Sequence, residues 1–200
     1  MGRPLRIVDT EAIYHCFARG NNKGPIAWDG DDGDVFLDQL DRAASMYRWD
    51  VYAWCLMPNH HHVVLRAPQD GLSDGFRLLN GNYARRTNRR HGRTDHLFRN
   101  RFRWVRLTSD VHLIAAIAYV VRNPLTAGLC RHAAEWRHSS YRATVGRAWA
   151  PRWLVVDRVL RLFGRTPEEA RRAFEAVVHN GRLVVSDTTG DPWPLEPYPV

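Results

Sequence analysis

The stretch DVYAWCLMPNHHHVVLR, residues 50–66, decides the fold. Residues 50–57 and 61–66 are rich in the β-branched and aromatic side chains that favour strands. Between them, Pro58 and Asn59 are typical of a tight turn. The stretch therefore predicts two consecutive antiparallel strands.

Three histidines begin the second of these strands. Because successive side chains of a strand alternate between its faces, His60 and His62 should point to one face and His61 to the other. Two imidazoles one residue apart can bind a single metal ion. A chance polar cluster fits the same pattern, and for His61 so does a hydrogen-bonded histidine in the core.

Outward from this hairpin, apolar periodicity and turn residues predict the remaining elements. We expect strands at 11–18 and 97–107, and helices at 34–47, at 72–91 with Ser73 as N-cap, and from 109 or 110 to 123, where Pro124 stops the helix. The order β, α, β, β, α, β, α indicates an α+β fold, a ferredoxin-like antiparallel sheet with helices packed on one face. We assign this domain to residues 1–148.

The remaining residues, 149–200, are predicted to be a small helical extension with a proline-rich tail. A short helix at 153–163 ends at Gly164. A second helix begins at Thr166-Pro167-Glu168-Glu169, a capping box with proline in the first helical position.

Basic side chains are concentrated in the first three quarters of the chain. The net charge is +8; residues 1–150 hold 22 basic and 14 acidic residues, and residues 151–200 hold seven of each. Such a surface favours polyanions, because each neutralised phosphate releases condensed counterions. Nucleic acid is therefore the leading partner.

Nine arginines lie between Arg85 and Arg106, interleaved with Phe98, Phe102 and Trp104. Guanidinium groups bind phosphates in bidentate fashion, and aromatic rings stack on unpaired bases. A solvated helix face beside core aromatics would give a similar pattern. We take as candidate DNA-binding residues Arg85, Arg86, Arg89, Arg90, Arg99, Arg101 and Arg103.

Cysteine usage and hydropathy suggest a compartment. Cys16, Cys55 and Cys130 are odd in number and widely spaced, which favours a reducing environment over a disulfide framework. The sequence has no signal peptide and no apolar run near the roughly 20 residues of a membrane helix. We expect a cytoplasmic, nucleoid-associated protein that does not contact the membrane.

Tyr119 and Asn123 form a second constellation. They stand four residues apart on the predicted helix that ends before Pro124, so their side chains share one helix face. A phenol could attack phosphorus beside a carboxamide that completes a metal shell. A core aromatic and a helix-ending asparagine are the simpler interpretation of the same pair.

Together these residues resemble the single-tyrosine HUH transposases, in particular the REP-associated tyrosine transposases. The resemblance covers about the first 145 residues in the family's order: GRPLRI (2–7), YHCFARGNN (14–22), WCLMPNHHHVVL (54–65), LNGNYARRTNRRHGRTDHLFRNRF (79–102), YVVRNPLTAGL (119–129) and WRHSSYRA (136–143). The family's HUH motif, histidine, bulky apolar residue, histidine, falls on His60, His61 and His62. The middle position departs from it, with a polar ring where the family packs an aliphatic side chain.

The resemblance implies a transposase that cleaves and rejoins single-stranded, hairpin-associated DNA through a 5′-phosphotyrosine intermediate. Tyr119 would be the nucleophile, and His60, His62 and Asn123 would hold Mg²⁺ or Mn²⁺. Tyr83 is the rival nucleophile, although its arginine neighbours fit DNA backbone contacts better.

Two other functions stay open at this point. A non-catalytic binder of nucleic-acid hairpins could use the same fold, and His61 in the motif keeps that alternative. A module stabilised by zinc is the second, but structural zinc usually takes four nitrogen or sulfur ligands and no cysteine is near in sequence. The resemblance is compatible with a monomer and with a homodimer.

Overall fold

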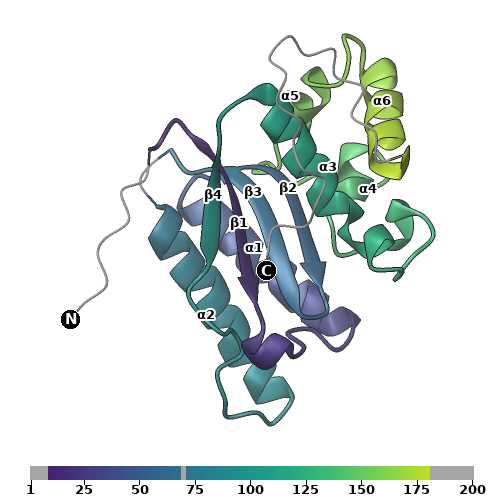
Figure 1. Cartoon of the computed structure of the whole chain (residues 1–200). Helices are drawn as coiled ribbons and strands as arrows, with labels where there is room; N and C mark the ends of the chain where they lie inside the picture. The colour runs from purple at the N-terminus through teal and green to yellow at the C-terminus, as the bar shows by residue number, and fades with distance from the viewer. Residues whose placement is uncertain (1–8, 69–70, 181–200) are drawn as a thin grey trace.

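A computed structural model describes residues 9–68 and 71–180 (Figure 1). The elements are β1 (Ile13–Arg19), η1 (Asn21–Lys23), α1 (Gly30–Met46), β2 (Asp50–Met57), β3 (His60–Arg66), α2 (Leu72–Arg90), β4 (Arg103–Leu107), α3 (Asp110–Thr126), η2 (Ala133–Glu135), α4 (Tyr141–Thr144), α5 (Val156–Arg161) and α6 (Pro167–Asn180). Strands and helices follow the predicted order through α3. The segment GRPLRI and the proline-rich tail lie outside the described residues.

The four strands form one antiparallel sheet in the order β2-β3-β1-β4. The hairpin predicted from residues 50–66 is confirmed as β2 and β3. β3 is a central strand, so His60 at its start lies between Met57 of β2 and Arg19 of β1. The antiparallel α+β class is therefore confirmed.

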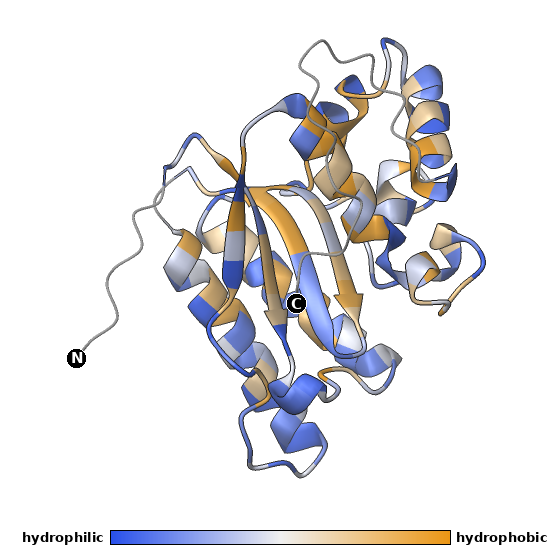
Figure 2. Cartoon of the chain, viewed as in Figure 1, coloured by the Kyte–Doolittle hydropathy of each residue, from blue (hydrophilic) through white to orange (hydrophobic). Residues whose placement is uncertain are grey.

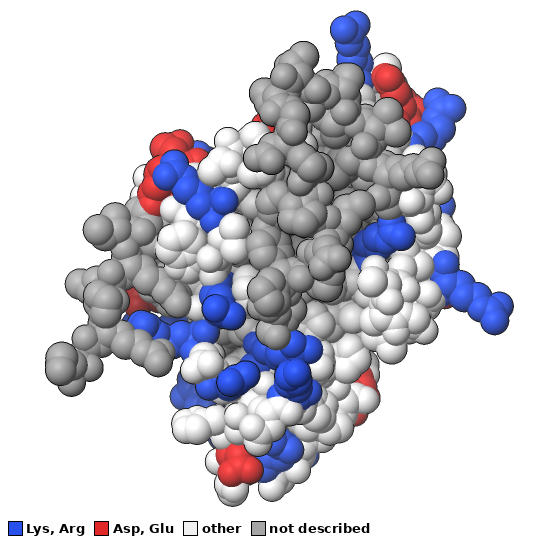
Figure 3. Space-filling model, viewed as in Figure 1, with Lys and Arg blue, Asp and Glu red and all other residues white. Residues whose placement is uncertain are grey.

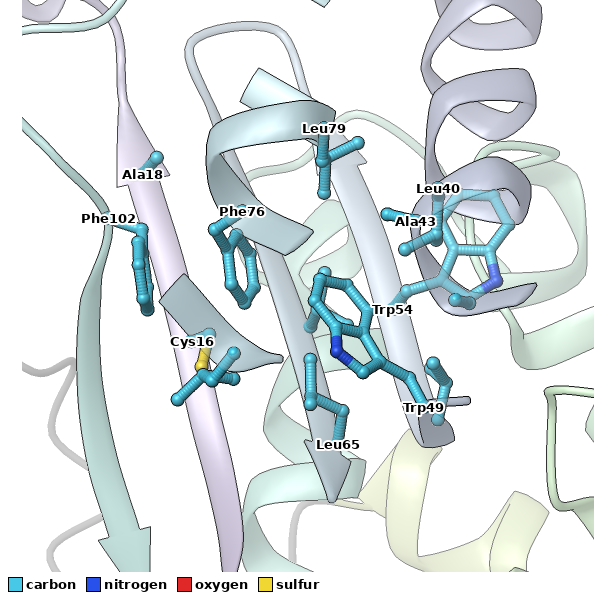
Figure 4. Close-up of a cluster of buried hydrophobic side chains, with 14 of the residues drawn as sticks. Cys16, Ala18, Leu40, Ala43, Trp49, Trp54, Leu65, Phe76, Leu79 and Phe102 are labelled. Carbon is cyan, nitrogen blue, oxygen red and sulfur yellow. The ribbon is translucent and has the colours of Figure 1, made fainter. Parts of the chain in front are cut away.

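Helices cover both faces of the sheet, which corrects the expectation of a single covered face. Val63 and Leu65 of β3 join α1 and α2 in one core, whereas Val64 joins α3 in a second core. Every residue of β2 after Asp50 is buried, so both of its faces need cover, and the apolar helix α3 covers the second. Figure 4 shows part of the first core, and Figure 2 shows hydrophobic residues along the strands beside a more hydrophilic α2.

Several other boundaries differ from the prediction. β4 is only Arg103–Leu107, because the backbone at Leu97 and Arg99 bonds instead to residues 19–21. α3 continues through Pro124 to Thr126: the proline removes only its own N–H from the last turn. Ser73 lies inside α2, whose N-cap is Gly71.

Of the C-terminal helices, α6 packs on α3, and α5 packs on α6 and β2. Phe174 and Val178 of α6 are fully buried in the second core, and the N–H of Val51 in β2 donates to Trp153 O at 2.8 Å. The predicted cap of α6 is present, since Thr166 Oγ1 accepts from Glu169 N at 3.3 Å. Among the described residues, no helix is long and apolar enough to span a membrane.

Two glycines of α2 should respond oppositely to alanine. A Cβ at Gly75 would overlap the buried ring of Trp49, whereas a Cβ at Gly81 would meet nothing within 4 Å. We expect Gly75→Ala to lower the free energy of unfolding by about 1–3 kcal/mol through overpacking. Gly81→Ala should raise it by up to about 1 kcal/mol through helix propensity. Urea unfolding followed by tryptophan fluorescence measures both, and equal effects would contradict the packing at Trp49.

Candidate active site

His60 and His62 lie on the face of the sheet that α3 covers. His61 points to the opposite face, where its ring lies 5.0 Å from that of Phe36 and its Nε2 is 2.8 Å from Asn80 Oδ1. This contact pairs one ring nitrogen of the polar middle residue, while its buried Nδ1 has no hydrogen-bond partner among the described residues. The ring lies in the α1–α2 core, on the face of the sheet away from the outer two histidines.

Each of these two outer histidines is held at its Nδ1 atom. His60 Nδ1 lies 2.7 Å from Asn59 Oδ1, and His62 Nδ1 lies 2.9 Å from Nε2 of His15 on β1. The two rings are 4.8 Å apart. Nε2 of His62 is buried and has no hydrogen-bond partner among residues 9–68 and 71–180. A buried nitrogen of this kind fits a metal ligand.

Burial keeps these imidazoles neutral. Desolvation lowers the pKa of His60 to about 4, helped by the charge of Arg19 and opposed by a hydrogen bond with Asn123. Desolvation, with the neighbouring histidines and Arg19, places the pKa of His62 well below 6.5. Metal ligation needs the neutral imidazole, so at neutral pH both rings are in the binding form.

α3 brings Tyr119 and Asn123 to the same place. The ring of Tyr119 lies 5.4 Å from that of His62 and 5.8 Å from that of His15. Asn123 Nδ2 donates to the carbonyl oxygen of Tyr119 at 2.9 Å, and Asn123 also hydrogen-bonds His60. Four residues that the sequence predicts as a site are therefore neighbours in the fold.

The phenol of Tyr119 is subject to opposing influences. Burial raises the pKa of Tyr119, while its hydrogen bond with Asn123 and the charge of Arg19 lower it. The residue is half-buried between α3 and the sheet. Its environment can thus stabilise a phenolate only through the polar groups on this face.

Tyr83, the rival nucleophile, lies elsewhere. It is fully buried in the core between α1, α2 and the sheet, and its hydroxyl donates to Ile26 O at 2.7 Å. Burial raises the pKa of Tyr83. It therefore faces away from His60 and His62, and its hydroxyl is occupied in the fold.

The connection from α2 to β4, residues 91–102, is hydrogen-bonded to the chain at the end of β1, beside the histidines. Asn21 N donates to Leu97 O at 2.9 Å and Arg99 N to Arg19 O at 3.0 Å, and Arg19 pairs with His60 across the strands. Arg103 pairs with Phe17, the residue that also pairs with His62. Figure 3 shows Lys and Arg side chains gathered over the part of this face where Figure 1 places the ends of β1 and β3 and the connection from α2.

The candidate DNA-binding arginines fall into two groups. Those on α2 are largely engaged within the protein: Arg90 bonds to Asp29, Asp31 and Asp32, Arg86 to Asp38, and Arg85 to Asn82. The second group is exposed and forms no ion pair among the described residues: Arg89, Arg99, Arg101 and Arg103.

Another cluster of potential ligands lies at the N-terminus of α1. Oxygen or nitrogen atoms of Asp29, Asp32 and His91 lie within 4.8 Å of one another, the only such group of at least three His, Cys, Asp or Glu residues among those described. The Arg90 guanidinium contacts both carboxylates and, by its hydrogen bond, lowers the pKa of Asp29 to about 2. This cluster is an ion-pair network joining α1 and α2, and its charge is already compensated.

The positions of the potential ligands argue against the zinc module. Apart from that cluster, the described residues contain no group of three or more His, Cys, Asp or Glu ligand atoms close enough to share an ion. Structural zinc sites usually have four such ligands. Within the part of the chain that the structure describes, His60 and His62 therefore lack the further ligands that a structural zinc usually has.

Sequence reasoning missed His15 and Arg19 at this site. Both lie on β1 with Phe17, every second residue, so strand alternation places the three on one face. The signal was present in the sequence. The sequence does not show, however, that β1 pairs with β3. The position of His15 and Arg19 beside His60 and His62 follows from that pairing.

The chain is similar to known proteins in sequence and in fold. The sequence model of the family described as "Transposase IS200 like" matches residues 9–123. A comparison with curated proteins found no significant match.

Two solved structures are similar to the chain. One, described as a REP-associated tyrosine transposase bound to a REP hairpin, is 16% identical and has a TM-score of 0.61, covering 76% of this chain and 89% of that one. A putative transposase from Deinococcus radiodurans is 21% identical, with a TM-score of 0.42, covering 56% and 91%. The first supports the fold.

Burial of the histidines predicts a loss of stability in mild acid. Desolvation lowers the pKa of His15 to about 3 and, opposed by the bond to Asn80, that of His61 to about 4. Between pH 6.5 and 4 the unfolded chain then binds more protons than the folded chain, so the free energy of unfolding falls as the pH falls. His61→Leu removes one of these groups. We therefore expect the slope of the free energy of unfolding against pH to decrease by up to about 1.4 kcal/mol per pH unit. Urea unfolding of wild type and His61→Leu at pH 7, 6 and 5, with chelator present, measures the free energy of unfolding of each protein at each pH. If this free energy depends on pH equally in the two proteins, His61 is not a neutral, buried histidine.

Proposed function

Because the chain belongs to the family of IS200-like transposases, we propose that it cuts and rejoins single-stranded DNA with Tyr119 as the nucleophile. One observation carries the proposal: the Tyr119 ring packs on His62, whose buried Nε2 has no hydrogen-bond partner among the described residues. A candidate nucleophile and an unused ligand atom thus lie side by side on one face of the sheet. This juxtaposition is what a metal-assisted transesterification at phosphorus requires.

His60, His62 and Asn123 are the proposed holders of a divalent cation, Mg²⁺ or Mn²⁺. Two neutral imidazoles and a carboxamide oxygen form a mixed nitrogen and oxygen set. The Nδ1 contact of His62 leaves its buried Nε2 for the ion, and at His60 the ion would replace the hydrogen bond with Asn123. Three protein ligands leave coordination positions for water and substrate. When bound, the ion would polarise the scissile phosphate and stabilise negative charge in the transition state.

Tyr119 carries the covalent step. Its oxygen attacks the phosphorus, a new tyrosine–phosphate bond forms, and the bond to the 3′ oxygen breaks, so that the leaving strand takes a proton and ends in a 3′-OH. A free tyrosine has a pKa near 10, and burial raises that of Tyr119. Asn123 and Arg19 favour the phenolate that must form. Attack by a second 3′-OH on the phosphotyrosine reverses the step and rejoins strands, because the number of phosphodiester bonds is conserved.

The exposed arginines are the proposed DNA contacts. Arg99, Arg101 and Arg103 lie on or next to a connection fastened beside His60, and Arg89 lies near the end of α2. Arg85, Arg86 and Arg90 would first have to exchange partners within the protein. The solved relative was bound to a REP hairpin, and we propose a DNA hairpin beside a single strand as the substrate of this chain too.

Replacing the nucleophile separates chemistry from binding. With a labelled hairpin oligonucleotide and Mn²⁺, Tyr119→Phe should form no covalent adduct on a denaturing gel, while its hairpin affinity should stay within about twofold, because only the attacking oxygen is removed. Tyr83→Phe is the matched control and should still form the adduct. An adduct that survives in Tyr119→Phe would assign the nucleophile to another residue.

The arginines can be tested by salt dependence. Replacing Arg99, Arg101 and Arg103 together with glutamine should reduce the slope of log affinity against log salt by about 2 for a single strand, since each phosphate contact contributes about 0.7. The control replaces three exposed arginines of the C-terminal region, Arg152, Arg161 and Arg165, with the same change in net charge. Equal slopes in both triple variants would mean that overall charge, not this connection, binds DNA.

A further inference from the structure

His15 is a buried histidine that the proposed chemistry leaves without a role. It lies in the middle of β1, is fully buried, and places Nε2 at 2.9 Å from Nδ1 of His62. Its ring also lies 5.8 Å from that of Tyr119. A hydrogen bond between two buried imidazoles is specific, because each neutral ring has one nitrogen that donates and one that accepts.

The proton in this bond can sit in two places, with opposite consequences for the site. If His15 Nε2 carries the proton, His62 must be protonated on Nε2, and its lone pair no longer faces outward. If His62 Nδ1 carries the proton and His15 accepts, Nε2 of His62 offers its lone pair. Only the second arrangement lets His62 bind a metal ion through Nε2.

We propose that His15 is a positioning residue: it accepts the Nδ1 proton of His62 and thereby fixes the tautomer and ring orientation that present Nε2 to the metal. The inference rests on the metal site of the proposed function. Asn59 provides the parallel on the neighbouring ligand, since its Oδ1 lies 2.7 Å from Nδ1 of His60. Partners of this kind orient ligating histidines and raise their basicity.

The choice of histidine as the acceptor follows from its surroundings. The position is fully buried beside Tyr119 and His62, where desolvation would penalise a charged carboxylate. An imidazole accepts the same hydrogen bond while neutral, and burial, which lowers the pKa of His15 to about 3, keeps it neutral. His15 thus orients the ligand without adding charge next to the phenol.

The tautomer can be measured without metal. In protein with ¹⁵N-labelled histidine, long-range ¹H–¹⁵N correlation should show wild-type His62 protonated on Nδ1. In His15→Leu, which fills similar volume but accepts no hydrogen bond, His62 should shift toward the Nε2-protonated form. His15→Gln, whose Oε1 can accept, should restore the Nδ1 form. An unchanged His62 tautomer in His15→Leu would overturn the proposal.

Metal affinity gives the second measurement. Titration with Mn²⁺ alone, followed by electron paramagnetic resonance of the free ion, should show a dissociation constant 10- to 100-fold higher in His15→Leu than in wild type. His15→Gln should recover most of this loss. Phe17→Leu is the packing control, because Phe17 touches the His62 ring without a hydrogen bond, and its affinity should stay within about threefold.

The outcomes distinguish the two proposals. Equal losses in His15→Leu, His15→Gln and Phe17→Leu would assign His15 a packing role only and overturn the inference. A wild-type protein with the Nδ1 tautomer that binds no Mn²⁺ would overturn the metal site of the proposed function and, with it, the purpose assigned to His15. Thermal unfolding of each variant establishes that the comparison is between folded proteins.

Discussion

The site depends on one constraint, the burial of β3 on both of its faces. A strand alternates its side chains strictly, so a strand between two cores must send each residue into one core or the other. His61 goes to the core of α1 and α2, with Asn80 as its partner, while His60 and His62 go to the face covered by α3. A slip of one residue would exchange these positions. The pairing of β3 with β2 and β1 on its two sides prevents such a slip.

Burial on that face has opposite effects on the two functional groups it contains. Desolvation favours the neutral form of every titratable group. It therefore prepares the imidazoles of His60 and His62 to bind metal, and it opposes ionisation of Tyr119. Arg19 and Asn123 act against this second effect, and a bound cation would add to them. The low-dielectric surroundings oppose ionisation of the Tyr119 phenol. They also strengthen its electrostatic interactions with Arg19, Asn123 and a bound cation.

Local patterns were sufficient to predict the hairpin and the helices, because alternation and helical periodicity are properties of neighbouring residues. The meeting of His60, His62, Tyr119 and Asn123 was implied by the resemblance to the transposase family, not by local pattern. Features that depend on pairing between distant segments could not be predicted. The contact of His15 with His62 joins residues 47 positions apart, and α3 covers the second face because β2 is buried on both sides. Residues 97–102 resemble a strand, yet their backbone bonds go to residues 19–21.

The arginines show why charge counted along a sequence overestimates the charge available to a ligand. Arg85, Arg86 and Arg90 belong to the densest basic run, but Arg90 holds three aspartates at the start of α1 and so joins that helix to α2. An arginine in such a network is costly to remove from it and contributes little to counterion release. Arg99 and Arg103 instead lie where the backbone is hydrogen-bonded to β1, Arg99 at Arg19, the partner of His60, and Arg103 at Phe17, the partner of His62. The position of the backbone, more than the density of charge, decides which cations can face a phosphate at the proposed metal site.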